Sequence, residues 1–269
     1  MRTRILTAAV VLPPLLALIV FAPAWVISLV VGLLAAWGLY EVAAMAGTSI
    51  AASVALLLPA GAGPALVGLL RWAPDLSAAL AAAAAGAMCG ITIWLNFRGG
   101  AETPPRTFLL ILGGLYVGAL YPYFALLRNQ AGGVELLLIM LLVVVAGDSG
   151  AYFVGRAIGR IKLMPAVSPG KTVEGALAYV TCSMIAACVI GKALGAAGSM
   201  GTLAGFGALI SIAAQMGDLV ESALKRIAGV KDSGWLFPGH GGLLDRTDSL
   251  VFAAAFAYYY SRWVGLAPA

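Results

Sequence analysis

The densest group of chemically capable side chains in this chain lies between residues 215 and 248. The segment holds five carboxylates and four cationic side chains, so its net charge is −1, while the surrounding sequence is strongly apolar. A surface that held anionic phosphate through charge alone would carry an excess of cations. Carboxylates mixed with Lys and Arg instead suit a divalent cation that bridges carboxylate and phosphate oxygens. The segment therefore predicts a metal-assisted phosphate site.

The first part of this segment has the spacing of a polar helix face. If residues 217–228 are helical, four polar side chains fall at i, i+4, i+7 and i+8 on one side, namely Asp218, Ser222, Lys225 and Arg226. Such a stripe alone is typical of a solvated face. The residues that follow it favour function, because they supply further carboxylates and a glycine-rich stretch. We therefore expect Ser222, Lys225 and Arg226 to bind substrate.

In the second part, Asp245 and Asp248 lie one helical turn apart at the start of the last apolar run. The glycine-rich stretch before them, which includes Gly241 and Gly242, allows the backbone to approach a ligand closely. We expect Asp218, Asp245 and Asp248 to converge on Mg²⁺, which prefers oxygen ligands and leaves positions for water or substrate phosphate. The number of cations is left open.

Three cations of the segment, Arg226, Lys231 and Arg246, are expected to neutralise charge on phosphoryl oxygens during a displacement. His240 is the only histidine, so a histidine-rich zinc site is excluded. Two roles remain open for His240, which are donation to a phosphate or leaving group and bracing of the glycine-rich stretch.

A second charged stretch, residues 148–174, ends in a group suited to an anion. Ser168, Lys171 and Thr172 offer hydroxyls and an ammonium group at the start of the next expected helix. It is not a Walker A loop, because Pro165 stands where that loop needs its first glycine. Contact with anionic lipid headgroups is an equally good interpretation for the three other cations of the stretch, which are Arg156, Arg160 and Lys162.

The elements that must position these residues are transmembrane helices. Of the 269 residues 62% are hydrophobic and 10% charged, with a mean hydropathy of +1.01, a balance that a water-soluble domain could not bury. We expect an all-α, polytopic helical bundle of about nine spans. The expected spans are 5–21, 24–40, 50–70, 76–97, 107–127, 134–147, 174–191, 201–217 and 249–265.

Charge placement predicts the orientation and the division of the chain. With the N-terminus inside, twelve of the sixteen Lys and Arg residues fall on the cytoplasmic side, together with the connecting stretches 148–173 and 218–248. The cations lie next to spans, so the net charge of +5 indicates membrane orientation and argues against nucleic acid as a partner. Residues 1–147 are expected to be a scaffold and residues 148–269 a catalytic region. Glu41 and Glu135 lie near span ends, where solvated carboxylates are common, and are assigned no role.

The charged segments resemble the signature of the phosphatidate cytidylyltransferases, also called CDP-diacylglycerol synthases. The matching pattern, S-x-L-K-R-x4-K-D-x-G-x2-F-P-x-H-G-G-x2-D-R-x-D, runs without a departure from Ser222 to Asp248. Residues 148–152, 155–156 and 168–172 also resemble segments of that family, so the similarity is strong over 148–248. The first half of the chain is similar only as a hydrophobic scaffold of several spans.

The resemblance implies transfer of CMP from CTP to phosphatidic acid, which yields CDP-diacylglycerol and pyrophosphate and requires Mg²⁺. It also implies a homodimer in the plasma (inner) membrane of a bacterial-type cell. In chemical terms, the lipid phosphate would attack the α-phosphorus of CTP in line, with the cation on the aspartates and Lys or Arg on the departing pyrophosphate. Two anionic substrates repel each other, which is a physical reason for a segment of mixed charge.

Three alternatives fit the sequence less well. A CDP-alcohol phosphotransferase is characterised by D-G-x2-A-R-x8-G-x3-D-x3-D, which is absent from this chain. An ion-coupled transporter would place charges near the middle of interrupted helices, whereas these are expected in connecting stretches. A catalytically silent scaffold would not explain so dense a group of potential ligands.

Overall fold

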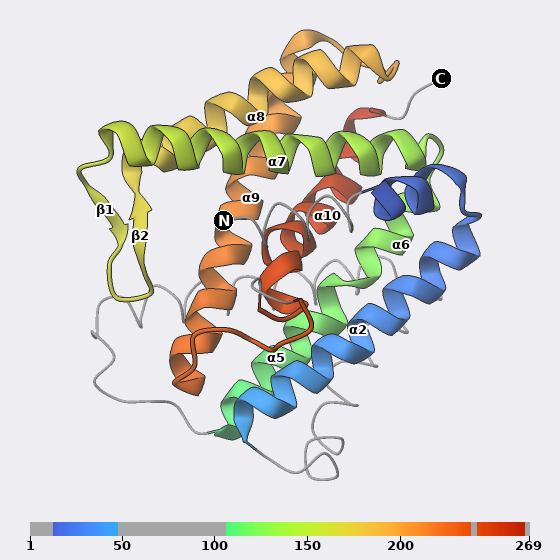
Figure 1. The fold of residues 1–269 in the computed structure, drawn as a ribbon. Coiled ribbons are helices and arrows are strands. Elements are labelled where there is room, and N and C mark those ends of the chain that lie inside the picture. Colours follow the sequence, from blue (N-terminus) through green and yellow to red (C-terminus); the bar gives the residue numbers. More distant parts are fainter. Residues whose placement is uncertain (1–12, 48–105, 238–240, 267–269) are drawn as a thin grey trace.

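A computed structural model of the protein describes residues 13–47, 106–237 and 241–266, which are mostly helical (Figure 1). Residues 13–21 form a helical segment ahead of the labelled elements. The elements that follow are α2 (Ala24–Ala46), α5 (Arg106–Leu120), α6 (Pro122–Arg128), α7 (Gly133–Ile158), β1 (Lys162–Met164), β2 (Ser168–Thr172), α8 (Val173–Ala193), α9 (Met200–Ala228) and α10 (Leu244–Val264).

Five helical stretches in the described part of the chain are long and apolar enough to cross a membrane, as expected for an integral membrane protein. They are α2, the continuous stretch Phe108–Arg128 formed by α5 and α6, α7, α8 and α9. Each corresponds to an expected span. The expected span 249–265 is helical in α10 but is not among these five. The expected spans 50–70 and 76–97 and much of 5–21 lie outside the described residues, so the count of nine stays a prediction.

Two helices continue well beyond the predicted ends of their spans. α7 runs on from residue 147 to Ile158, and α9 runs on from residue 217 to Ala228, so both charged stretches begin as helix. Gly147 and Gly217 lie inside these helices, where the absence of a side chain allows close packing. A methyl group at Gly147 would overlap the Tyr179 ring, and one at Gly217 would overlap the backbone carbonyl oxygen of Asp248.

The expectation of an all-α fold is wrong in one place, where β1 and β2 form an antiparallel hairpin between α7 and α8. Prolines at positions 165 and 169 disfavour a continuous helix there. Lys162 pairs with Thr172 and Met164 with Ser168, and the Arg226 Nε of α9 donates to the Val167 carbonyl oxygen at 3.2 Å. Figure 1 shows the hairpin extending from one end of α7 and α8.

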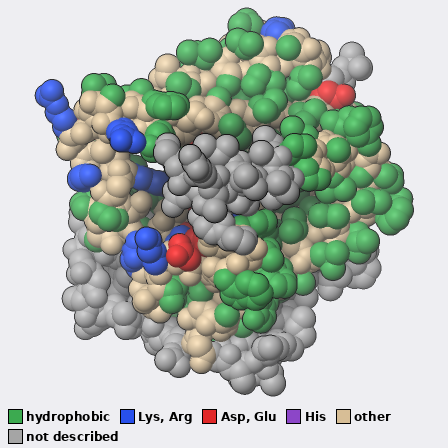
Figure 2. Space-filling view, in the orientation of Figure 1, with side chains coloured by type: hydrophobic (Ala, Val, Ile, Leu, Met, Phe, Trp, Pro, Cys, Tyr) green, Lys and Arg blue, Asp and Glu red, His purple; other side chains and the backbone are tan. Residues whose placement is uncertain are grey.

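The core fixes the first turns of α10. Helices α7, α8, α9 and α10 pack on one another in turn, and α2 packs against α5 and α6. The buried Tyr116 hydroxyl lies 3.3 Å from the Asp248 carbonyl oxygen, to which it donates, and the Tyr121 hydroxyl lies 2.6 Å from Thr247 Oγ1. In Figure 2 hydrophobic side chains cover much of the visible face, and several Lys and Arg side chains gather on the side of the hairpin.

Candidate functional site

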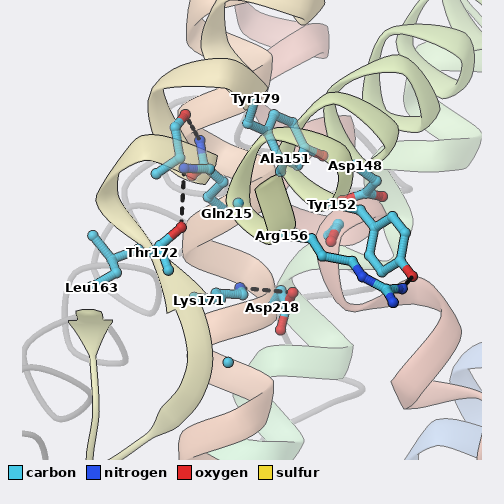
Figure 3. A pocket seen from close by; sticks show the side chains of 15 residues that line it. Asp148, Ala151, Tyr152, Arg156, Leu163, Lys171, Thr172, Tyr179, Gln215 and Asp218 are labelled. Carbon is cyan, nitrogen blue, oxygen red and sulfur yellow. Dashed lines mark hydrogen bonds and ion pairs between the residues drawn. The ribbon is translucent and has the colours of Figure 1, made fainter. Parts of the chain in front are cut away.

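Two cavities adjoin each other at the end of the bundle that carries the hairpin. The first has a volume of about 470 Å³ and lies between α7, β2, α8 and α9 (Figure 3). Its wall is mixed, with Tyr152, Leu163 and Tyr179 beside the cations Arg156 and Lys171. Such a wall suits a ligand with both an anionic and an apolar part.

The second cavity, of about 420 Å³, is lined by polar residues from α9, the loop after it and the start of α10. Arg226, Lys231 and Arg246, the three cations expected to act on phosphoryl oxygens, line it together with Ser222 and Asp232. Lys231 and Arg246 are exposed at its rim. Its lining holds five carboxylates and four cations, so it suits an anionic ligand that is accompanied by a divalent cation.

Three residues, Asp148, Asp218 and Ser249, line both cavities. Asp218 forms an ion pair with Lys171 at 2.7 Å, and Ser222 Oγ donates to Asp218 at 3.4 Å. Figure 3 shows the Lys171 and Asp218 side chains pointing toward each other, joined by the dashed line of this ion pair. The boundary between the two cavities is therefore acidic, with a single cation from β2 in contact with it.

Asp248 lines the second cavity and adds a further carboxylate beside this boundary. It is half-buried, and one of its oxygens accepts the Ser249 N–H at 2.7 Å. Removal from bulk water, together with the negative charges of Asp218 and Asp148, raises the pKa of Asp248 to about 8. Like charges held this close are a known feature of sites that bind a cation or carry out chemistry.

Asp245 is held differently from the other two predicted ligands. Its Oδ1 lies 2.6 Å from Lys225 Nζ, and its Oδ2 accepts the N–H groups of Ser233 and Gly242, both at 2.8 Å. Burial opposes ionisation of Asp245, but these hydrogen bonds outweigh it and lower the pKa of the carboxyl below its ordinary value. Both oxygens are thus engaged in holding the loop that precedes α10.

Lys225 was expected to bind substrate, and in the structure its ammonium group lies between two buried carboxylates. Lys225 Nζ is 2.6 Å from both Glu221 Oε2 and Asp245 Oδ1. The lysine thereby ties α9 to α10 from within the protein, although it also reaches the wall of the polar cavity. No local pattern indicates this contact, because Glu221 and Asp245 are 24 residues apart.

The fit of the site to Mg²⁺ depends on how many carboxylates the ion needs. Among the described residues, no three Asp, Glu, His or Cys side chains are arranged to hold one metal ion together. Mg²⁺ in substrate-assisted sites commonly uses one or two carboxylates, and waters and phosphates complete its shell. Asp218 and Asp248 at the junction fit that requirement. Asp148 is a third candidate, which its position as a carboxylate within a long apolar helix could have indicated.

The glycine-rich stretch approaches internal carboxylates. Gly241 has a left-handed φ of 81°, and an added methyl group there would overlap Asp245 Oδ2. The Gly242 N–H is the donor to Asp245 already described. Gly241 and Gly242 therefore shape the loop from inside and are not lining residues of either cavity. His240 lies outside the described residues, so both of its roles stay open.

The anion cradle expected at the start of α8 is partly used by the protein itself. The Val173 N–H donates to the Ile161 carbonyl oxygen at 2.9 Å, and the Gly175 N–H donates to Thr172 Oγ1 at 3.2 Å. Ser168 lines neither cavity, whereas Lys171 and Thr172 line the first. The charge of Lys171 is thus the main contribution of this segment to an anion site.

Because Thr172 caps α8, we expect Thr172→Ala to lower the free energy of unfolding by about 1 kcal/mol. Thr172→Ser keeps the hydroxyl, so its free energy of unfolding should lie within a few tenths of a kcal/mol of the parent value. Thermal melts of both variants in one detergent measure the difference. Equal melting temperatures for the two variants would contradict the capping role.

Comparison with known proteins gives a consistent result. Residues 2–264 match the model of a family described as the cytidylyltransferase family. The chain is 41% identical over 169 residues to the uncharacterized protein YnbB of Escherichia coli (strain K12), covering 59% of this chain and 56% of that protein. It is 40% identical over 151 residues to a phosphatidate cytidylyltransferase of Bacillus subtilis (strain 168), covering 56% of each. A phosphatidate cytidylyltransferase of Staphylococcus haemolyticus (strain JCSC1435) is 44% identical over 137 residues, covering 51% of this chain and 52% of that one. The aligned region thus spans about half the length of each relative.

Proposed function

Because this chain belongs to the cytidylyltransferase family, we propose that it is a membrane enzyme that transfers CMP from CTP to phosphatidic acid, forming CDP-diacylglycerol and pyrophosphate. Two of the relatives above bear the name phosphatidate cytidylyltransferase. The observation that carries the proposal is the junction of two cavities of different character at Asp148, Asp218 and Ser249. A transferase with one lipid and one nucleotide substrate needs two such compartments that meet at the reacting atoms.

We assign phosphatidic acid to the first cavity and the triphosphate of CTP to the second. The mixed wall of the first accommodates the glycerol end of a lipid, and Lys171 holds its phosphate near the junction. The second cavity offers Arg226, Lys231 and Arg246 to the β- and γ-phosphates. Both anions then approach the same acidic boundary from opposite sides.

In the proposed reaction an oxygen of the lipid phosphate attacks the α-phosphorus of CTP. A new P–O bond forms to the lipid phosphate, and the bond from the α-phosphorus to the bridging oxygen breaks, so pyrophosphate leaves with the electron pair. Lys171 orients the attacking phosphate, and the three cations of the second cavity stabilise the charge that builds on the pyrophosphate. Mg²⁺ held by Asp218 and Asp248 would offset repulsion between the two substrates and polarise the α-phosphate.

We further propose that the site opens to the cytoplasm of a bacterial-type cell and that the enzyme is a homodimer. The orientation is supported by the distribution of Lys and Arg between the two sides of the membrane. The bacterial inner membrane is supported by the sources of the relatives above. The homodimer rests on the family resemblance alone.

The decisive test is a transfer assay with the full chain purified in detergent. The protein is incubated with labelled CTP, with and without phosphatidic acid and with and without Mg²⁺, and then with ATP or UTP in place of CTP. We expect a labelled lipid product only when CTP, phosphatidic acid and Mg²⁺ are all present. The absence of any lipid-dependent nucleotide product would overturn the proposed function.

A further inference from the structure

The carboxylate of Glu41 lies buried near the C-terminal end of α2, and four donors surround it. Its Oε1 accepts Trp37 Nε1 at 2.9 Å and the Leu243 N–H at 2.8 Å. Its Oε2 accepts Ser233 Oγ and the Leu244 N–H, both at 2.9 Å. A carboxylate is an acceptor only, so it satisfies four donors in a way that no other side chain of this size can. Glu41 was assigned no role because solvated carboxylates are common near span ends, but the side chain is not solvated, since the residue is 2% exposed.

Two of these donors are backbone N–H groups at the start of α10, at Leu243 and Leu244. N–H groups at this end of a helix have no partner within the helix, and the helix dipole is positive there. Asp245 and Asp248 follow within the next turn. A negative charge from α2 thus holds the end of the helix on which both aspartates are carried.

The third donor connects Glu41 directly to Asp245. Ser233 Oγ lies 2.9 Å from Glu41 Oε2 and 2.9 Å from Asp245 Oδ2, so its single hydrogen can serve either carboxylate. The Ser233 N–H also donates to Asp245 Oδ2. The loop between α9 and α10 is therefore held at Ser233 by one carboxylate from each half of the chain.

At two positions of the loop, the Glu41 carboxylate leaves no room for a side chain larger than that of glycine. A methyl group at Gly234 would lie 2.7 Å from Glu41 Oε1, and one at Gly242 would lie 2.5 Å from Glu41 Oε2. Both distances are shorter than carbon and oxygen atoms tolerate. Gly234 and Gly242 thus allow the loop to close around the Glu41 carboxylate.

We propose that Glu41 is a positioning residue, which sets the start of α10 and the preceding loop so that Asp245 can brace the loop and Asp248 faces the site in the correct geometry. It touches neither cavity, so it acts through these backbone and Ser233 contacts. The kinetic consequence rests on the proposed function, whereas the structural consequence does not.

The kinetic arm compares Glu41→Gln with Glu135→Gln, the same change in the first turn of α7. In Glu41→Gln an NH2 group replaces one acceptor and faces two donors, so the loop must shift. Displacement of reacting groups by about 1 Å can cost about 10²-fold in rate, and we expect kcat to fall by that order with KM for CTP within about threefold. Both variants are assayed well below their melting temperatures, and Glu135→Gln should match the parent protein. A folded Glu41→Gln variant with the kcat of the parent protein would overturn the proposal.

The structural arm measures hydrogen–deuterium exchange of the full chain. Its measurement on the parent protein depends neither on activity nor on a folded variant. In the parent protein, the amide hydrogens of Leu243 and Leu244 should be protected to the same degree as the Thr202 amide, which Ser199 caps at the start of α9. In Glu41→Gln the amide hydrogens of Leu243 and Leu244 should lose protection, and the Thr202 amide should keep it. Rapid exchange at Leu243 and Leu244 in the parent protein would overturn the proposal. If the parent protein lacks CMP transfer, the proposed function fails, and this arm still decides the role of Glu41.

Discussion

Asp218→Asn is expected to lower the rate of CMP transfer by about 10²- to 10³-fold, the range for loss of one group that stabilises a transition state electrostatically. Asp218 lines both cavities and carries the charge that contacts Lys171. The amide has nearly the same shape but no charge, so it binds a cation poorly and no longer balances the lysine. The effect is measured as kcat/KM with saturating Mg²⁺ and phosphatidic acid.

The same substitution should leave the fold intact. The Asp218 side chain is 31% exposed, and its ion pair with a 25% exposed lysine contributes at most about 1 kcal/mol after solvent screening. A melting temperature close to that of the parent protein, with transfer lost, would separate chemistry from stability. Glu135→Gln is the matched control for the change of acid to amide. Near-normal turnover of Asp218→Asn would remove this residue from the site.

Asp245→Asn should lose both stability and activity. Asp245 is buried, pairs with Lys225 and accepts two backbone N–H groups of the loop. Lys225 keeps Glu221 as a partner, but the amide of Asn presents an NH2 group to donors that the carboxylate now accepts. A buried donor left unsatisfied in this way typically costs about 1 to 3 kcal/mol. The loop before α10 would loosen in consequence, and transfer would fall with it. Thermal melts and transfer rates of the same preparation give both quantities.

Asp232→Asn provides the matched comparison for stability. Asp232 is an exposed carboxylate of the same loop, so its change should alter the free energy of unfolding by no more than about 0.5 kcal/mol. If Asp245→Asn melted at the same temperature as Asp232→Asn while losing all transfer, Asp245 would be a ligand or catalytic group and not a brace. Asp245 would then act at the site alongside Asp218 and Asp248, as the sequence analysis expected.

Several features followed from the sequence alone. Long apolar runs can satisfy their backbone hydrogen bonds in lipid only as helices, so α2, α7, α8 and α9 were predictable from composition and length. The crowding of carboxylates and cations within 148–248 was enough to predict a phosphate site at a membrane, and the resemblance of residues 222–248 to a known signature indicated the family that the comparison then identified. These inferences use local composition and pattern, which do not depend on how distant segments pack.

The tertiary structure decided what each charged residue does. Asp218 faces two cavities, whereas Asp245 is satisfied by Lys225 and backbone N–H groups, although both belong to the same charged segment. Glu41 was passed over because three of its four hydrogen-bond donors lie about 200 residues away in the chain. The physical reason is that hydrogen-bond satisfaction and burial are properties of the packed fold. A carboxylate becomes a ligand or a brace according to which donors the other helices bring to it.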